Sequence, residues 1–168
     1  MIASQRFLSL LIVLLGIWGA SGMARADAQL GQNELPVHDV ARMGNQAEME
    51  RMLKADPALR DTPTLALGSM PLHLAALNFD SGPLKALLAA GAPVNVRDKN
   101  GATPLHMAAF ATRTENAKLL LQAGADPLIK THEGRDVASL ARRVRADEVA
   151  GIVSMWLLKG CKAGMACF

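Results

Sequence analysis

The sequence lacks the short motifs that carry most known catalytic chemistry. It has no nucleophile elbow, phosphate-binding loop, zinc-ligand spacing or glycine-rich dinucleotide fingerprint, and its carboxylates form no repeated pair suggestive of hydrolysis. We therefore expect no catalytic residue, no bound metal and no cofactor, and predict that the protein is not an enzyme. The alternative is a catalytic site assembled by tertiary proximity in a deep pocket of ionisable groups.

The chain also lacks a large excess of one charge sign. The chain has 18 lysines and arginines and 15 acidic residues, which gives a formal net charge of +3. Arg6 and Arg25 lie in the first 26 residues, and without them the two signs are nearly balanced. Nucleic-acid binding needs many basic side chains on one face. We therefore expect no nucleic-acid partner.

No apolar run reaches the length of a typical membrane span. The run over residues 7–20 is broken by two glycines, whereas a bilayer crossing takes about 20 apolar residues. Arg6 precedes the run, and Ala24-Arg25-Ala26 follows it with the small-x-small pattern of a cleavage site. These features predict a cleaved secretory signal peptide over residues 1–26, with a membrane anchor as the alternative.

Cysteine is scarce, and none stands directly after the apolar run at the first mature position, so lipid attachment there is not expected. The mature protein is predicted to be periplasmic or secreted, monomeric, and without stable membrane insertion.

With 51% apolar residues in 168, the chain is neither disordered nor collagen-like. Its length favours one compact domain with short appendages.

An internal repeat at an offset of 33 is the strongest positive signal. Residues 68–92 share 12 identities with the segment 33 positions later, where chance would give roughly two. A weaker copy follows, and an earlier, less regular one precedes at an offset nearer 35. In the best copy, Gly101 allows a tight bend, Thr103 can cap a helix through its hydroxyl, and Leu105 begins an apolar face. Each unit is therefore predicted to be a turn, a helix, a tight turn and a second helix.

Two segments carry a family resemblance: Thr103-Pro104-Leu105-His106-Met107-Ala108-Ala109 and Leu120-Leu121-Gln122-Ala123-Gly124-Ala125-Asp126 resemble the ankyrin repeat. The resemblance implies a mainly α fold, an ankyrin-repeat solenoid of about four helix-turn-helix units with short hairpin-like turns. Met70 departs from the pattern at the cap position, where Ser69 is a possible substitute, and Asp136 replaces the threonine in the last unit. The expected boundaries are a lead-in at 27–34, an ankyrin domain at 35–159 with units at about 35–66, 67–99, 100–132 and 133–159, and a tail at 160–168.

Three histidines fit a structural role better than a chemical one. His73 and His106 occupy the same repeat position, so the fold should separate them by one repeat, and His38 begins the first unit. The resemblance implies that these side chains bond to backbone near the turns. His132 falls at a turn tip, where binding is the more natural role.

The resemblance also implies a partner protein, of unknown identity, that binds a concave face of turn tips and first helices. Three of the expected contact positions carry apolar residues, although polar residues would be enough for solubility: Leu65, Leu67 and Phe110. Such residues are typical of a binding hot spot, and local packing of a longer loop is the alternative. Arg142, Arg143 and Arg145 fit either a solvated helix end or an acidic partner. The predicted contact residues are Leu65, Leu67, Ser69, Leu77, Asn78, Lys99, Asn100, Ala102, Phe110, Ala111, His132, Glu133, Arg135 and Arg143.

Cys161 and Cys167 are the only cysteines, and export would place them in an oxidising compartment. A disulfide that pins the tail over the last repeat is the expected role; a redox or metal-handling function of this pair is the alternative. Resemblance to exported bacterial ankyrin proteins implies an adaptor in envelope stress or peroxide defence, or an inhibitor or immunity factor.

Overall fold

The computed structural model describes residues 34–165 and residue 167. The predicted signal peptide and nearly all of the predicted lead-in lie outside these described residues. The described residues from Leu35 onward form one compact unit. Within the described part of the chain there are eight α-helices, a short 3₁₀ helix and no strands, which confirms the mainly α prediction. None of the described helices is long and apolar enough to cross a membrane.

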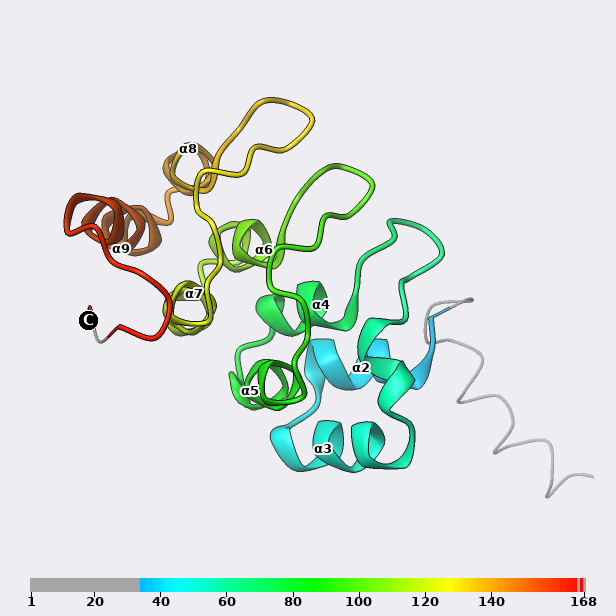
Figure 1. Ribbon diagram of the computed structural model, residues 1–168. Coiled ribbons are helices and arrows are strands. Elements are labelled where there is room, and N and C mark those ends of the chain that lie inside the picture. The colour runs from blue at the N-terminus through cyan, green and yellow to red at the C-terminus, as the bar shows by residue number, and fades with distance from the viewer. Residues whose placement is uncertain (1–33, 166, 168) are drawn as a thin grey trace, which may run out of the picture. The chain divides into compact units, whose positions relative to one another are not determined.

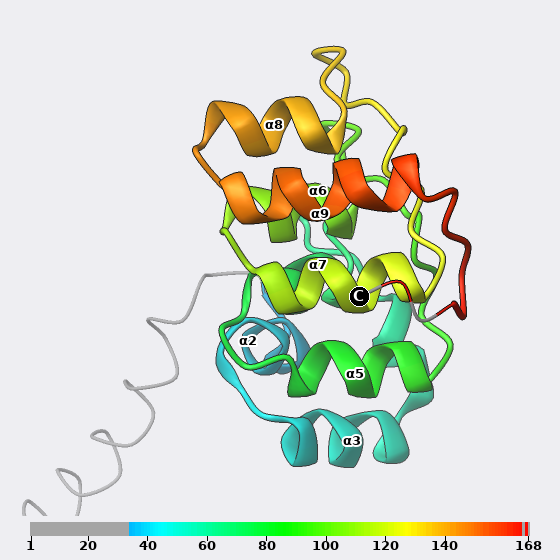
Figure 2. The ribbon, with the colours of Figure 1, turned by 90° about the vertical axis from the view of Figure 1, so that its left-hand side faces the viewer.

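The helices follow one another in antiparallel pairs (Figure 1). Helices α2, α4, α6 and α8 make one row of mutual contacts, and their partners α3, α5, α7 and α9 form a second row (Figure 2). Extended loops join one pair to the next and project to the same side of the unit (Figure 1). The bounds are α2 Pro36–Met43, α3 Gln46–Ala55, the 3₁₀ helix Pro57–Asp61, α4 Pro71–Leu77, α5 Gly82–Ala89, α6 Pro104–Phe110, α7 Thr114–Gln122, α8 Val137–Arg143 and α9 Asp147–Leu158.

Alanine and leucine build the core between successive pairs. Leu105, Ala108 and Ala109 of α6 are fully buried, as the repeat pattern predicts. The equivalent leucine and alanines of α4 are buried as well, and leucines of α5 and α7 fill the space behind them. Small side chains allow neighbouring helices to approach closely, and the branched chains supply apolar contact area.

A buried histidine joins each unit to the next. His106 accepts a hydrogen bond at Nδ1 from the Thr103 N–H (3.2 Å), and its Nε2–H donates to the carbonyl of Arg135 in the following turn (3.2 Å). Backbone N–H can only donate and backbone C=O can only accept, so this histidine must be neutral, with its proton on Nε2. His73 bonds in the same way to Met70 N–H and Ala102 C=O, and His38 to Leu35 N–H and Thr62 C=O. The predicted backbone role of these histidines is confirmed.

The helix caps differ from expectation in two places. The Thr103 hydroxyl does not bond to the helix backbone, because it donates instead to His106 Nδ1 at 2.8 Å. Ser69 does not cap α4 either; the cap residue is Met70, whose N–H is taken by His73. Asp136 does cap α8, since its Oδ1 accepts from the Ser139 N–H at 2.8 Å.

Buried asparagines form hydrogen bonds across two of the interfaces between units, at the end away from the histidines. Asn78 Nδ2 donates to the carbonyls of Ala41 and Gly44, at the end of α2. Asn116 Nδ2 lies within hydrogen-bond distance of three carbonyls at the end of α4, the shortest being that of Asn78 at 2.9 Å. Helix ends leave carbonyls without intrahelical partners, so these amides satisfy groups that the next unit buries.

Thr112 holds a backbone conformation that disfavours its side chain. Its φ is 57°, and Arg145, 33 positions later, has a φ of 60°. Holding a β-branched residue in the left-handed region costs about 1–2 kcal/mol, and glycine avoids this cost. Part of that gain is offset because glycine loses more backbone entropy on folding. Thr112→Gly should therefore raise the free energy of unfolding by about 1 kcal/mol in urea denaturation. Thr112→Ala is the control, because it keeps the Cβ; an equal gain from alanine would contradict the strain argument.

Stability should fall as the solution is acidified. Burial lowers the pKa of His73 and of His106 below the ordinary value of 6.5. At pH values near 6.5, the unfolded chain therefore binds more protons than the folded chain. The histidines contribute their full stabilisation above that ordinary pKa, and this contribution decreases as the pH falls through and below it. The decrease is at most about 1.4 kcal/mol per pH unit for each histidine. Denaturant titrations between about pH 7.5 and pH 5 would measure this slope.

His106→Gln separates the contribution of one histidine to this slope. Glutamine does not titrate, so this variant should be less stable at neutral pH but should lose less on acidification. His132→Gln is the matched control, since the His132 side chain is exposed. An unchanged slope in His106→Gln would show that another group governs acid sensitivity.

Candidate protein-binding face

The loop tips are tied to one another through their backbones. Lys99 N–H donates to the Leu67 carbonyl, and His132 N–H donates to the Asn100 carbonyl, each at 2.9 Å. The three turns therefore stack in order along one edge of the unit (Figure 1). Side chains at these tips project from a supported backbone rather than from independent loops.

Each turn is also closed internally by one polar side chain at its start. Asp98 Oδ1 accepts from the backbone N–H groups of Asn100 (2.9 Å) and Ala102 (2.8 Å). Thr64 has the same place in the preceding turn, where its hydroxyl oxygen accepts from the Ser69 N–H at 3.0 Å. Four residues separate Thr64 from Ser69, but only three separate Asp98 from Ala102. The first of these turns is therefore one residue longer.

The longer turn exposes apolar side chains. Leu65 is 69% exposed and Leu67 is 49% exposed. Lys99 reaches back from the next turn, and its Nζ donates to the carbonyls of Leu65 and Ala66 at 2.9 Å each. The two leucines are consequently held outward by a hydrogen-bonded backbone, so local packing of the loop does not bury them.

The predicted contact residues divide by exposure into three sets. Those with exposed side chains are Leu65, Leu67, Lys99, Asn100, Phe110, His132, Glu133 and Arg143, which we call the tip face. Those that are half-buried are Leu77, Ala111 and Arg135. Those that are buried are Ser69, Asn78 and Ala102.

The three buried members serve the fold. Asn78 supports the end of α2, the Ala102 carbonyl accepts from His73, and Ser69 closes its own turn with bonds to Thr64 in both directions. They offer little side-chain surface to a partner. Contact with a partner therefore remains a prediction for the tip face, with the half-buried residues at its margin.

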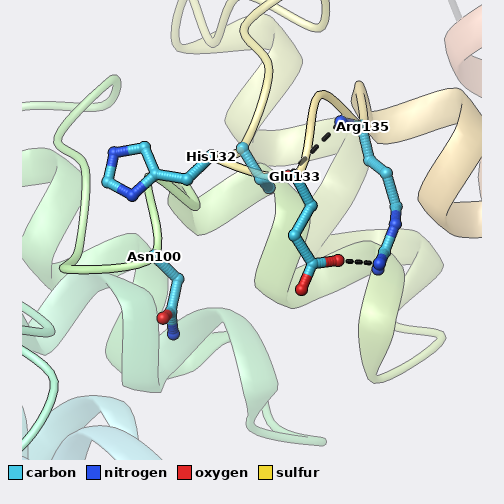
Figure 3. Close-up of a pocket in the computed structure, with 5 residues that line it drawn as sticks. Asn100, His132, Glu133 and Arg135 are labelled. Carbon is cyan, nitrogen blue, oxygen red and sulfur yellow. Dashed lines mark hydrogen bonds and ion pairs between the residues drawn. The ribbon is translucent and has the colours of Figure 1, made fainter.

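A polar pocket of about 310 Å³ opens between the last two turns (Figure 3). Asn100, Thr131, His132, Glu133 and Arg135 line it, and the Glu133 carboxylate forms an ion pair with the Arg135 guanidinium. Among the described residues, no group of three or more histidine, cysteine or acidic side chains is placed to hold a metal ion. The pocket offers hydrogen-bond donors and acceptors to a polar ligand group.

Two basic residues at these tips, Arg97 and Lys130, were not among the predicted contact residues. Both are exposed, and they stand at the same position of successive units. Arg97 Nη2 donates to the Lys130 carbonyl at 2.8 Å, so its guanidinium spans the gap between the two turns. The 33-residue offset between two basic residues was the available signal. Phe79 was also missed: it is 87% exposed, with the Arg113 guanidinium 3.3 Å from its ring centroid.

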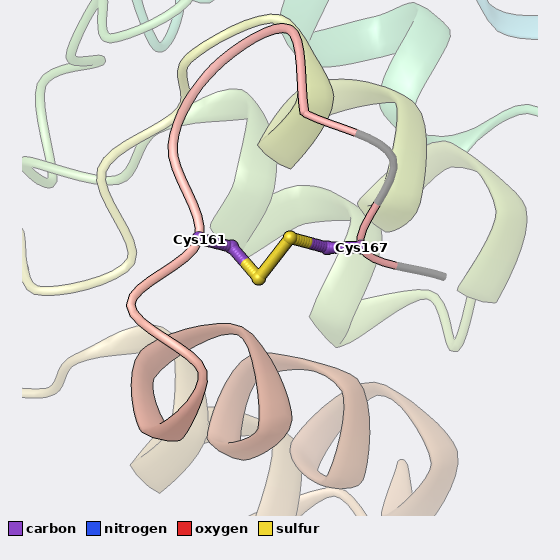
Figure 4. Close-up of a disulfide and its surroundings, with 2 residues drawn as sticks. All are labelled: Cys161 and Cys167. Atoms are coloured by element: carbon purple, nitrogen blue, oxygen red, sulfur yellow. A yellow bond between two sulfur atoms is a disulfide. The ribbon is translucent and has the colours of Figure 1, made fainter.

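The C-terminal tail folds back from α9 toward the end of α7 (Figure 2). The sulfur atoms of Cys161 and Cys167 lie 2.09 Å apart, at disulfide distance (Figure 4). Gly164 N–H donates to the Gln122 carbonyl at 2.9 Å, and both cysteines are partly buried against the core. The tail thus contacts the end of α7 in the preceding unit, and a pinning role for the disulfide stays a prediction.

Loss of this disulfide should lower stability without unfolding the array. Closing so short a loop contributes about 2 kcal/mol by restricting the unfolded chain. Cys161→Ser/Cys167→Ser should reduce the free energy of unfolding by that amount, reductant should do the same to the unmodified chain, and the two effects should not add. Unchanged stability together with lost cellular activity would instead favour a redox role for the pair.

Comparison with known proteins agrees with this architecture. The family model described as ankyrin repeats (3 copies) matches residues 37–131, more than half of the chain. A search of curated proteins found no match. The matched region runs from α2 to α7 and contains the first two of the three linked turns, whereas nearly all of the third turn and the pair α8–α9 follow it. The chain belongs to the ankyrin-repeat family.

Proposed function

We propose that this protein is an adaptor that binds one partner protein through the tip face. Ankyrin repeats as a class indicate a role in protein–protein interaction rather than catalysis. The observation that carries the proposal for this surface is the pair of exposed leucines, Leu65 and Leu67, on a turn to which Lys99 donates two hydrogen bonds. An ordered, exposed apolar group loses little conformational entropy when a partner covers it.

Export to a periplasm, or secretion, is part of the same proposal. The signal-like pattern in residues 1–26 and a cysteine pair at disulfide distance support it, because disulfides persist in oxidising compartments. In that setting the proposed roles are envelope stress or peroxide defence, or inhibition of an envelope toxin as an immunity factor. A monomeric adaptor without membrane insertion is proposed.

Two substitutions test the binding face. Leu67→Asp and Phe110→Ala remove exposed apolar side chains that make little contribution to the core, so helix content should remain intact while partner capture falls about tenfold. The measurement is chemical crosslinking in cells that express the full chain, followed by mass spectrometry of the captured protein.

Leu158→Asp is the matched control for this experiment. Leu158 is 88% exposed at the end of α9, outside the tip face, so its replacement should leave capture unchanged. Full retention of the partner by both Leu67→Asp and Phe110→Ala would refute the assignment of this face.

A further inference from the structure

Positive charge gathers where the turns of the last three units meet. Lys99 bonds back to the turn containing Leu65, and Arg97 bonds forward to the turn containing Lys130. Both links end on backbone carbonyls, which carry no net charge. Lys130 is exposed beside them. Three cations therefore follow the joints of the stacked turns.

The acidic residues of these turns form no ion pair with the three cations in the described part of the chain. Asp98 is buried, its Oδ1 accepts two backbone hydrogen bonds, and its Oδ2 has no hydrogen-bond partner. Glu133 is paired with Arg135. Within residues 34–165, no ion pair involves Arg97, Lys99 or Lys130. A ligand carboxylate could therefore pair with these cations without displacing an existing ion pair.

Helix α8 extends this charge. Arg142 and Arg143 are exposed in its last turn. The pKa of the Asp136 carboxyl lies below its usual range, mainly because Ser139 donates hydrogen bonds to it, with smaller contributions from Lys130 and Arg142. Asp136 caps α8, so the last turn, which contains Lys130, leads directly into the helix that contains Arg142.

We propose that the partner contacts this edge with an acidic segment, whose carboxylates bind Arg97, Lys99 and Lys130 while an apolar side chain covers Leu65 and Leu67. This inference rests on the proposed protein-binding function and specifies its chemistry. Charge complementarity selects carboxylates, and the leucines at one end give the bound segment a direction. A nucleic acid or a lipid surface fits less well, since the cations are few, Glu133 stands among them, and the leucines would lack a partner in a phosphate backbone.

The experiment is selection from a library of random peptides of about twelve residues displayed on phage, with the full chain as bait at physiological ionic strength. Selected peptides should be enriched in aspartate and glutamate, with apolar residues toward one end. Replacing their acidic residues by asparagine and glutamine should weaken binding about tenfold or more. Raising the salt concentration should weaken binding as well.

Charge-reversal variants locate the contact. Lys99→Glu/Lys130→Glu should lose the acidic peptides, and Lys130→Glu alone should weaken them although it breaks no side-chain hydrogen bond among the described residues. Lys54→Glu/Lys85→Glu is the matched control, because it makes the same charge change at exposed positions of α3 and α5. This control should bind the acidic peptides as the unmodified chain does.

The remaining outcomes overturn the inference. These are selected peptides without acidic enrichment, no selected peptides, equal losses in the control, or tighter retention of single-stranded DNA or phosphatidylglycerol vesicles. A different outcome is selection of apolar peptides whose binding is lost with Leu67→Asp but unchanged with Lys99→Glu/Lys130→Glu. That outcome would support the protein-binding function and reject its acidic specificity. Peptides indifferent to all of these variants would contradict both.

Discussion

Stacking in this protein depends on a neutral histidine buried between two turns. Its Nδ1 accepts a hydrogen bond from the backbone N–H at the start of its own helix. Its Nε2–H therefore donates to an acceptor in the following turn. In the third unit that acceptor is the Arg135 carbonyl, so His106 sets where the following turn must lie. Alanines and leucines pack between the units, and Asn78 and Asn116 satisfy helix-end carbonyls at the far side of two interfaces.

Because helices and backbone make these interfaces, the turn tips are free to vary. The turn that ends at Ser69 gains a residue and exposes leucines, whereas the next one is a compact turn organised by Asp98. Lys99 joins the two by bonding to carbonyls of the longer turn. The same edge thus changes from apolar to cationic along the array.

The last unit shows what happens where stacking ends. Arg142 occupies the position of Ala109, which is fully buried one unit earlier, and it is exposed because no other unit among the described residues covers it. Terminal repeats tolerate such polar replacements since one of their faces meets water. The tail then folds back to contact the end of α7, through the bond from Gly164 to Gln122.

The repeat offset and the apolar positions within each unit were sufficient to predict the helix pairs, the buried Leu105 and Ala108, and the structural use of His73. Those features follow from local periodicity, which a single sequence displays directly. Exposure at the turns was harder to predict, because one inserted residue moves the turn-closing role from Leu65, the position at an offset of 33, to Thr64. Only tertiary structure showed that Asn78 reaches the neighbouring unit and that Arg97 bridges two turns, since both depend on where a side chain points across an interface between units.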